Sequence, residues 1–578
     1  MRNKQKFISY TILFFFLVVP WFEGGKEASF LFLTEGSVLL LFLLYLNGRD
    51  SLPKTSVLFP LLLLLVWIAL SCIFALSLHK GLIGLIRVVI LALLYFLLVE
   101  YAPDLRDKLF IVIVLTAAIL GLWGISERLA GRTPLAAFTN SNHLASYLCV
   151  ASVIVMGRLF QGKDMKNTIV LSLMFVLLST ALFLTRSRGG ILAFLLLVFF
   201  FSWWRFGIPG IAVLSIVLLG GFVLIPNNLL SVFLKLEGDP HAWQRIKIWQ
   251  ASFKVIFQKP VFGAGLGSFE QAFYPFNFPF SSTVARYGHV TRFAHSELLQ
   301  LAAEAGLPAL VAFLWILARF FKRGLFMLRG KSEFFIASGG LLVIITQAIF
   351  DFNLHLPAIA LPFIFFGSLL SREEARFPLS GWQRMSLNVL LIGALLLITG
   401  NYVGNVFHQN GKYQTALLFD PLNPVHSEKL GDRFYKNKND LCAGLAYQAM
   451  IWLSPSDPYL QEKMGDFQYV QGEEINALSH YQKAVHQHPF NVFLRMKVAR
   501  YHMNRGHYLR AQEVLQKIIR LEPFFLGAHY LSGFCYFMVG NQKKAEGKKE
   551  VLKYLSTHHP PARTEYERAL LYIPEGRE

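Results

Sequence analysis

Long apolar stretches fill the first 400 residues and constrain the fold more than any other feature. A helix needs roughly 20 apolar residues to cross a bilayer. About thirteen such stretches lie near 7–23, 29–47, 56–76, 81–100, 109–126, 143–161, 167–185, 189–205, 208–226, 306–321, 335–352, 356–371 and 385–403. Over its 578 residues the chain is 54% hydrophobic and only 16% charged. The sequence therefore predicts an all-α, polytopic transmembrane helical bundle of 12 to 13 spans.

The loops between these stretches alternate between basic and less basic segments, which predicts an orientation. The basic set is MRNKQK, GRDSLPK, LRDK, GRLFQGKDMK, RFFKRGLFMLRGK and SREEARFPLSGWQR. The positive-inside rule places these loops, and with them the N-terminus, in the cytoplasm. No small-residue cleavage site follows the first apolar stretch, so we interpret it as a span rather than a signal peptide. The net charge of +20 is then a property of membrane loops and does not indicate nucleic acid.

The last third of the chain is polar and repeats every 34 residues. Prolines recur with this spacing at Pro421, Pro455, Pro489 and Pro523. Small residues do the same at Gly431, Gly465, Ala499 and Gly533, and at Ala443, Ala477, Ala511 and Ala545. This is the tetratricopeptide pattern of paired helices. We predict an α-helical repeat solenoid over about 424–557, led by the half-repeat GKYQTALLFDP.

These patterns predict two domains. Residues 1–404 form a transmembrane domain with a large periplasmic loop at 227–296, and residues 405–578 form a periplasmic repeat domain. Repeat solenoids usually bind peptides or proteins, although a rigid spacer is the alternative. The four cysteines have no CxxC spacing, and no acidic cluster has metal-ligand spacing. We therefore expect no metal and no cofactor.

The face predicted to be external carries more arginine than the orientation rule allows. These residues are Arg186 and Arg188 in TRSRGG, and Arg245, Arg286 and Arg292 in the long loop; Arg87 lies inside a span, toward its outer end. Arginine binds phosphate oxygens with a two-pronged fork and keeps its charge. The set predicts an anion site, whereas contact with lipid headgroups is the simpler alternative for any single member.

The stretch RFAHSELLQLAAEAG (292–306) places His295 at the start of a helix. Ser296 can cap this helix, Glu297 lies in its first turn, and Gly306 can end it. A neutral histidine near pH 7 suits a general base for an acceptor hydroxyl. The alternative is that His295 belongs to an ordinary helix start.

Three further stretches carry polar groups at the ends of spans. WQRIKIWQASFKVIF (243–257) is typical of an interfacial amphipathic helix and contains Trp249. FTNSNHLASYL contains Asn142 and His143, and DFNLHLPAIA contains Asp351 and His355. Such groups either cap helices or line a cavity. The glycine-rich FGAGLGSF follows no strand, so we interpret it as a tight loop rather than a dinucleotide site.

Together these motifs resemble the O-antigen ligase and polymerase family of membrane glycosyltransferases. The matching motifs are NSNHLA, TRSRGG, R-x-x-x-W at Arg245 and Trp249, KPVFGAGLGSF, AHSELLQLAAEAGLPAL and DFNLHLPA, in this order over roughly 138–370. The family motif usually has histidine followed by asparagine, whereas this chain has His295 followed by Ser296. A contact made by the asparagine amide is therefore lost or replaced. The first five spans match in hydropathy only.

The resemblance implies glycan transfer from a polyprenyl (undecaprenyl) pyrophosphate carrier to an acceptor hydroxyl, metal-independent and with inversion at the sugar. It implies that His295 is the base and that Arg245 with Arg186 or Arg188 binds pyrophosphate. Arg292 and Arg87 are further pyrophosphate candidates, and Asn142, His143, Trp249, Glu297, Asp351 and His355 are supporting candidates. It also implies the inner membrane of a bacterium, with the repeats in the periplasm.

Several alternatives remain open at this point. The acceptor can be lipid A–core, another glycan chain or a protein hydroxyl, and the repeats can bind a protein partner. A second class of function is a non-enzymatic, membrane-anchored scaffold or a transporter of lipid-linked sugars, in which the arginines only hold lipid. A transporter is expected to carry more charged residues deep in its spans, and only Arg87 is a clear example.

Overall fold

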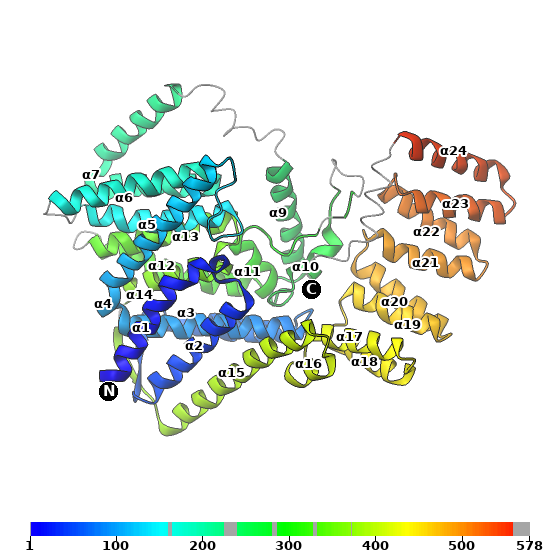
Figure 1. Ribbon diagram of the computed structural model, residues 1–578, viewed down its shortest axis with the longest axis horizontal. Coiled ribbons are helices and arrows are strands. Elements are labelled where there is room, and N and C mark those ends of the chain that lie inside the picture. Colours follow the sequence, from blue (N-terminus) through cyan, green and yellow to red (C-terminus); the bar gives the residue numbers. More distant parts are fainter. Residues whose placement is uncertain are drawn as a thin grey trace. The chain divides into compact units, whose positions relative to one another are not determined.

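The structure is a computed structural model that describes residues 2–159, 165–224, 240–279, 286–288, 290–327, 332–371 and 373–558 (Figure 1). Within these ranges, seven helices are long and apolar enough to cross a membrane by length and composition. They are α2 (Ala28–Leu46), α4 (Leu78–Leu129), α5 (Ser141–Leu159), α6 (Met165–Leu184), α7 (Arg188–Leu224), α13 (Ser332–Phe350) and α15 (Gly381–Gln409). The chain is a nearly all-α, multi-pass membrane protein.

The thirteen predicted stretches reduce to these seven because some are continuous, others are short, and α12 carries Arg319, Lys322 and Arg323. Helix α4 contains two of them, with Pro103 between. Helix α7 contains two more, which are separated where Gly207 leaves the helical conformation at φ 65°. The remaining ones correspond to α1 (Arg2–Val18), α3 (Leu58–Ile73), α12 (Leu307–Met327) and α14 (Pro357–Leu370). The end of the predicted span 208–226 and the first part of the predicted loop, to 239, lie outside the described residues.

One short antiparallel sheet interrupts the all-α pattern. Strand β1 (Ser51–Thr55) pairs with β2 (Glu373–Pro378), with Leu52 opposite Phe377 and Lys54 opposite Ala375. The sequence does not predict this sheet, because each strand is short and rich in charge and proline. The pairing requires both loops to lie on one side of a membrane, which agrees with their place in the same basic set.

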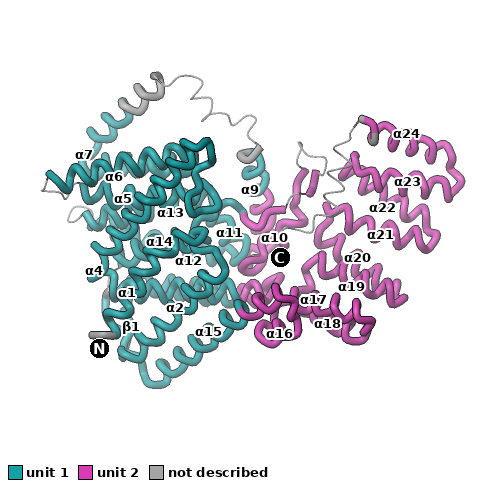
Figure 2. Tube along the Cα trace, viewed as in Figure 1, with its two compact units in different colours: residues 1–70, 83–249, 294–402 teal, residues 71–82, 250–293, 403–578 magenta. Residues whose placement is uncertain are grey.

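The structure divides into two compact units that do not follow chain order (Figure 2). Unit 1 comprises residues 1–70, 83–249 and 294–402. Unit 2 comprises residues 71–82, 250–293 and 403–578. Unit 2 therefore joins the repeats to a short turn and to most of the long loop. The membrane and periplasmic assignment of the two predicted domains remains a prediction.

The C-terminal part of unit 2 consists of paired helices with the predicted 34-residue period. After α16 (Tyr413–Phe419) come α17 (Pro424–Lys436), α18 (Asp440–Leu453), α19 (Pro458–Val470), α20 (Glu474–Gln487), α21 (Val492–Asn504), α22 (Tyr508–Leu521), α23 (Leu526–Met538) and α24 (Gln542–His558). The small residues are needed for close packing. A Cβ atom on Gly431 would lie 2.6 Å from the Tyr447 ring, and one on Gly465 would lie 2.7 Å from the Tyr481 ring.

Candidate active site

The residue that the sequence singles out, His295, has a strained backbone. Its φ is 48°, in the left-handed region that residues other than glycine rarely adopt. Such strain persists only where the surroundings impose it, and it concentrates at functional sites. The following helix α11 runs over Glu297–Ala305 and ends at Gly306 with φ 85°, as predicted.

The turn that carries His295 is not held in the predicted way. Ser296 occupies the N-cap position of α11, but its side chain makes no capping hydrogen bond. Gln300 holds the turn instead, because its Oε1 accepts the backbone N–H of Ala294 at 2.6 Å. The Gln300 amide in turn donates to Glu304 at 2.8 Å. Glu304 is thus a structural residue of α11.

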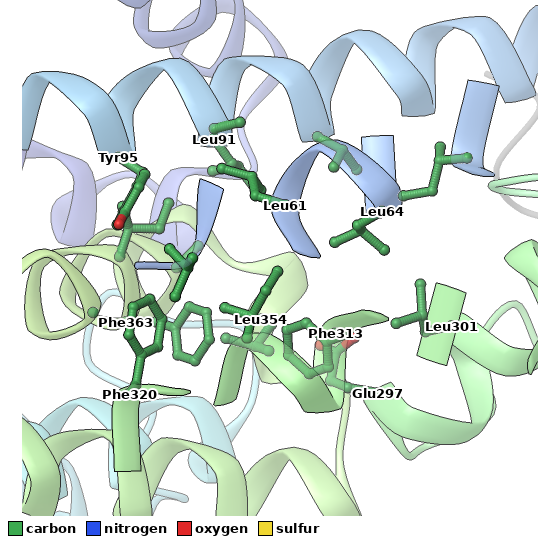
Figure 3. Close-up of a pocket in the computed structure, with 18 residues that line it drawn as sticks. Leu61, Leu64, Leu91, Tyr95, Glu297, Leu301, Phe313, Phe320, Leu354 and Phe363 are labelled. Atoms are coloured by element: carbon green, nitrogen blue, oxygen red, sulfur yellow. The ribbon is translucent and has the colours of Figure 1, made fainter. Parts of the chain in front are cut away.

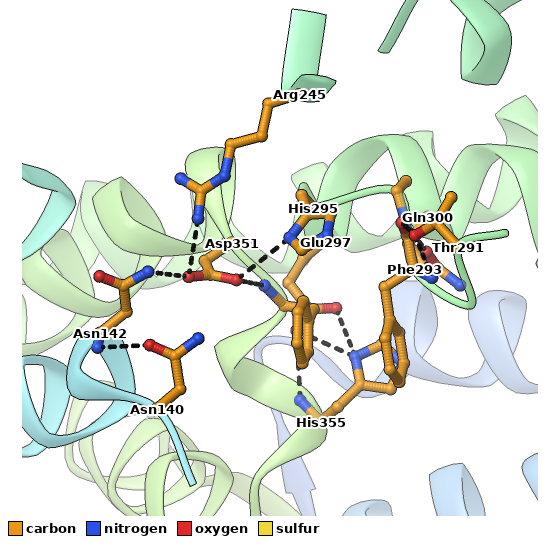
Figure 4. A network of polar contacts seen from close by, with 12 residues as sticks. Asn140, Asn142, Arg245, Thr291, Phe293, His295, Glu297, Gln300, Asp351 and His355 are labelled. Carbon is orange, nitrogen blue, oxygen red and sulfur yellow. Dashed lines mark hydrogen bonds and ion pairs between the residues drawn. The ribbon is translucent and has the colours of Figure 1, made fainter. Parts of the chain in front are cut away.

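Asp351, directly after α13, lies at the centre of the polar cluster (Figure 4). Its Oδ1 lies 3.8 Å from His295 Nδ1, and its Oδ2 lies 3.6 Å from the Arg245 guanidinium. The Asn142 amide donates to Oδ2 at 2.8 Å. Burial alone would raise the pKa of Asp351, but His295 and the Arg245 charge outweigh it and lower this pKa to about 2. The carboxylate is therefore ionised at any physiological pH.

Helix α9 (Pro240–Gln258) supplies both residues of the R-x-x-x-W motif. Arg245 and Trp249 are one turn apart, so they lie on the same face of the helix. Arg245 is near Asp351, while Trp249 Nε1 donates to the carbonyl oxygen of His295 at 3.3 Å. The motif thus positions a cation and fixes the backbone of the candidate base.

A second carboxylate–histidine pair borders the cluster. Glu297 accepts the backbone N–H of His355 at 3.2 Å and lies 3.1 Å from its Nδ1. Burial by itself would lower the pKa of His355, yet the Glu297 charge raises it above its ordinary value. His143 is 1% exposed, and neither of its ring nitrogens has a hydrogen-bond partner among the described residues. A buried polar group in this state is destabilising, so His143 is suited to contact a ligand.

Two members of the cluster escaped the sequence analysis. The Lys26 amine lies 5.0 Å from the centroid of the Phe352 ring. Phe352 also contacts the His295 ring edge-on. Burial lowers the pKa of Lys26, although the Asp351 and Glu297 charges oppose this. The arginines are identified in the sequence as basic residues on the predicted external side. Lys26, in the first external loop, meets the same criterion and could have been found in this way.

The backbone before Lys26 depends on two glycines. Gly24 and Gly25 have φ of 68° and 91°. Cβ atoms on them would lie 2.7 Å from Leu356 and 2.8 Å from Pro357. Only glycine satisfies both conditions. The pair therefore lets this loop pack against the start of α14, close to the segment that carries His355.

The other predicted arginines lie at three different places. Arg186 (φ 56°) and Arg188 are exposed at the turn between α6 and α7. Gly190 follows, and a Cβ there would lie 2.7 Å from Ala145, so this turn lies near the end of α5 that carries Asn142. Arg87 pairs with Glu35 of α2 at 2.8 Å, which accounts for a charge within a span.

Arg292 belongs to unit 2, where its guanidinium lies 3.7 Å from Glu270. The roles of all these arginines in binding stay predictions. The residues that the structure joins into one cluster are therefore Asn142, His143, Arg245, Trp249, His295, Glu297, Asp351 and His355, together with Lys26 and Phe352.

An apolar cavity of about 230 Å³ lies within unit 1 and reaches Glu297 (Figure 3). Its walls come from α3, α4, α11, α12 and α14. Aliphatic and aromatic side chains such as Leu61, Leu91, Phe313 and Phe363 dominate the lining, and Glu297 is its charged member. The cavity can therefore hold a hydrocarbon chain whose polar end lies near Glu297.

Fold and site define a multi-pass membrane protein with a histidine, an arginine and a buried carboxylate in one polar cluster. Residues 173–314 match a protein-family model described as O-Antigen ligase. This match, over about a quarter of the chain, supports a membrane glycosyltransferase of ligase or polymerase type. Arg245, Trp249 and His295 lie inside the matched quarter of the chain, whereas Asn142 and Asp351 lie outside it.

Several solved structures are similar to less than a third of the chain. MamA shares 18% identity and covers 28% of this chain and 97% of its own, with a TM-score of 0.25. YrrB, a TPR protein described as having an unusual peptide-binding site, shares 17% identity over 30% of this chain and 92% of its own (TM-score 0.25). Pseudomonas aeruginosa pilF shares 14% identity over 32% and 89% (TM-score 0.23). No curated protein sequence matches the chain.

Proposed function

We propose that the protein transfers a glycan from a polyprenyl pyrophosphate carrier to an acceptor hydroxyl, with His295 as the general base. One observation carries this proposal: His295, on a strained backbone, shares the ionised Asp351 with Arg245. The cluster thus offers a base for the acceptor next to a cation for the leaving group.

The reaction follows from the roles of these groups. Asp351 lies on the Nδ1 side of the His295 ring, which leaves Nε2 to take the proton of the acceptor hydroxyl. The acceptor oxygen then attacks the anomeric carbon, and the bond from this carbon to the pyrophosphate oxygen breaks. The leaving pyrophosphate is a stable anion, so it needs no general acid. Its new negative charge is stabilised by Arg245 and by Arg186 or Arg188. A single displacement of this kind inverts the sugar.

The distance between His295 and Asp351 leaves room for a closer contact. At 3.8 Å the pair is too long for a hydrogen bond. Catalytic contacts of this kind tighten when substrate binds. We expect the lipid-linked donor to draw Arg245 toward its phosphates and to let the carboxylate move closer to the histidine.

The apolar cavity supports a donor with a long isoprenoid tail. Its lining is almost entirely hydrocarbon and includes Glu297, two residues after His295 in the chain. A tail in this cavity keeps the phosphates of the donor close to the cluster. We further propose that the protein lies in a bacterial inner membrane, with the cluster and the repeats on the periplasmic side. A reporter fused after Glu578 should then be active in the periplasm, whereas a cytoplasmic signal would contradict this topology.

The decisive experiment is reconstitution of the full chain in nanodiscs with a lipid-linked glycan. Lipid A–core, a free glycan chain and a hydroxyl-bearing protein are offered in turn, and one of them should become glycosylated. His295→Ala should abolish transfer while the donor still binds. Transfer by the variant at the wild-type rate would reject the base. Transport of the donor without transfer would favour the transporter alternative.

A further inference from the structure

One edge of the repeat array carries residues that differ in chemistry although their positions are equivalent. These residues, called here the edge row, directly precede the four repeat prolines: Asp420, Ser454, His488 and Glu522. Each is the C-cap of the second helix of a repeat. Equivalent positions in a repeat usually carry similar residues, because they meet similar surroundings. The differences within the edge row therefore indicate specific neighbours.

Two edge-row residues contact the long loop, which is part of the same compact unit. The Glu522 carboxylate accepts the backbone N–H groups of Arg286 at 2.9 Å and of Tyr287 at 2.8 Å, one on each oxygen. The His488 ring stacks on Tyr274, with 4.3 Å between centroids and 5° between planes. Glu522 and His488 are each 2% exposed, so both contacts are shielded from water.

A third edge-row residue, Asp420, contacts the start of helix α4. Its Oδ2 lies 3.1 Å from His79 Nε2. Ser454 makes no such contact with the described residues, but Asp457, three residues later, supplies one. One oxygen of Asp457 caps α19, and the other accepts the Gln271 amide at 3.2 Å. The array thus holds non-repeat segments at every repeat boundary.

The loop and the turn between α3 and α4 also bind each other. The Ser71 hydroxyl donates to the Phe262 carbonyl at 2.6 Å, and the Leu76 N–H donates to the Ala264 carbonyl at 2.8 Å. Gly265 has φ 93°, and a Cβ there would lie 2.2 Å from the Cβ of Ala75. The glycine-rich FGAGLGSF therefore serves close packing against this turn, which agrees with the predicted tight loop.

Electrostatics argue that the acidic edge-row residues are present for these contacts. The C-terminus of a helix carries partial negative charge, so a carboxylate there is unfavourable for the repeat by itself. Asp420 and Glu522 both occupy such positions. Hydrogen-bond donors from outside the array, namely His79 and the amides of 286 and 287, offset this cost.

We infer that the repeat array is an intramolecular clamp, whose edge row, together with Asp457, binds His79, residues 271–274 and residues 286–287 of its own chain. The clamped loop continues at one end into α9, which carries Arg245, and at the other into the residues before His295. Its partner at this edge is therefore the reaction loop and not a foreign peptide. The docking itself is independent of the proposed function, while its effect on transfer rests on that function.

Hydrogen–deuterium exchange of the full chain in nanodiscs tests the clamp. Glu522→Ala removes a buried charged acceptor of two amides, so exchange at residues 286–288 should accelerate about tenfold. His488→Ala should accelerate exchange over 270–279 to a similar extent, whereas His488→Phe keeps a stacking ring and should not. Glu513→Ala, the same kind of truncation at an exposed glutamate of α22, is the matched control and should leave the loop unchanged.

Unchanged loop exchange in Glu522→Ala and His488→Ala would overturn the clamp. If these variants unfold the array, the same contact can be tested from the loop side, which leaves the repeats unchanged. Loop exchange is then compared between Tyr274→Ala, which removes the ring, and Tyr274→Phe, which keeps it. Transfer activity is measured separately. Faster loop exchange in a chain that never transfers glycan would support the clamp and reject the proposed function.

Discussion

Two histidine–aspartate pairs among the described residues, His295–Asp351 and His79–Asp420, have opposite character. In unit 1, His295 and Asp351 are 3.8 Å apart, the histidine backbone is strained, and Arg245 shares the carboxylate. In unit 2, His79 and Asp420 are 3.1 Å apart, and Asp420 also receives the Asn423 amide at 3.2 Å. Both carboxylates accept hydrogen bonds from protein groups, but His295 Nδ1 has no hydrogen-bond partner among the described residues, whereas His79 Nε2 is bonded to Asp420. Unused capacity, rather than residue type, distinguishes a reactive pair from a structural one.

The strongest test of this comparison removes each histidine in turn. His295→Ala should lower transfer by roughly 100- to 10,000-fold, the range for loss of a general base. His79→Ala keeps every reacting group, so its turnover should stay within about tenfold of wild type. Rates are measured with purified lipid-linked donor. Equal losses in both variants would mean that the two pairs do not differ as we describe.

The arginine near the first pair gives the next largest effect. Arg245→Lys keeps the charge but loses the two-pronged fork, so transfer should fall by roughly 100-fold. Arg384→Lys, at an arginine paired with the exposed Asp50, is the control and should be nearly neutral. Near-normal turnover by the Arg245 variant would argue that phosphate is bound elsewhere.

The carboxylate of the first pair should have a smaller effect, because it acts through its neighbours. Asp351→Asn keeps the size but removes the charge that His295 and Arg245 share, and kcat should fall roughly tenfold. Asp351→Glu should recover part of this loss if the carboxylate positions the two cations. A merely structural role would give lower stability of both variants without this pattern in kcat.

The smallest predicted effect is the pH dependence of loop docking in unit 2. Burial lowers the pKa of His488 to about 3, below the ordinary value of 6.5, so docking favours the neutral ring. Docking is then fully stable above about pH 6.5 and weakens as pH falls toward 3. At pH 5.5 the loss is about 1.4 kcal/mol, or a tenfold gain in loop opening. Exchange over 270–279, corrected for its intrinsic pH dependence, should show this gain in the wild type but not in His488→Phe.

The sequence predicts the two architectures well because each has a local period. Membrane spans follow from continuous apolar runs, and the solenoid follows from prolines and glycines spaced by 34. His295 and α11 also follow from local signals, since Gly306 ends the helix as expected. Three features do not follow from local signals: the short sheet, the Gln300 contact that replaces a Ser296 cap, and the position of Lys26. Each of these depends on residues that are distant in the sequence or on a choice between local partners.

The sequence by itself determined that this chain crosses a membrane, ends in a helical repeat array and carries cationic groups near His295. Hydropathy and repeat spacing suffice for this, because burial in lipid and helix packing act on nearest neighbours along the chain. Only the tertiary structure decided which polar groups meet. It placed Asn142, Arg245 and His295 around Asp351, and it brought the edge row into contact with the chain's own loop. These contacts join residues as far apart as Asn142 and Asp351 (209 positions) or Arg286 and Glu522 (236 positions), and no periodic pattern in the sequence predicts such partners.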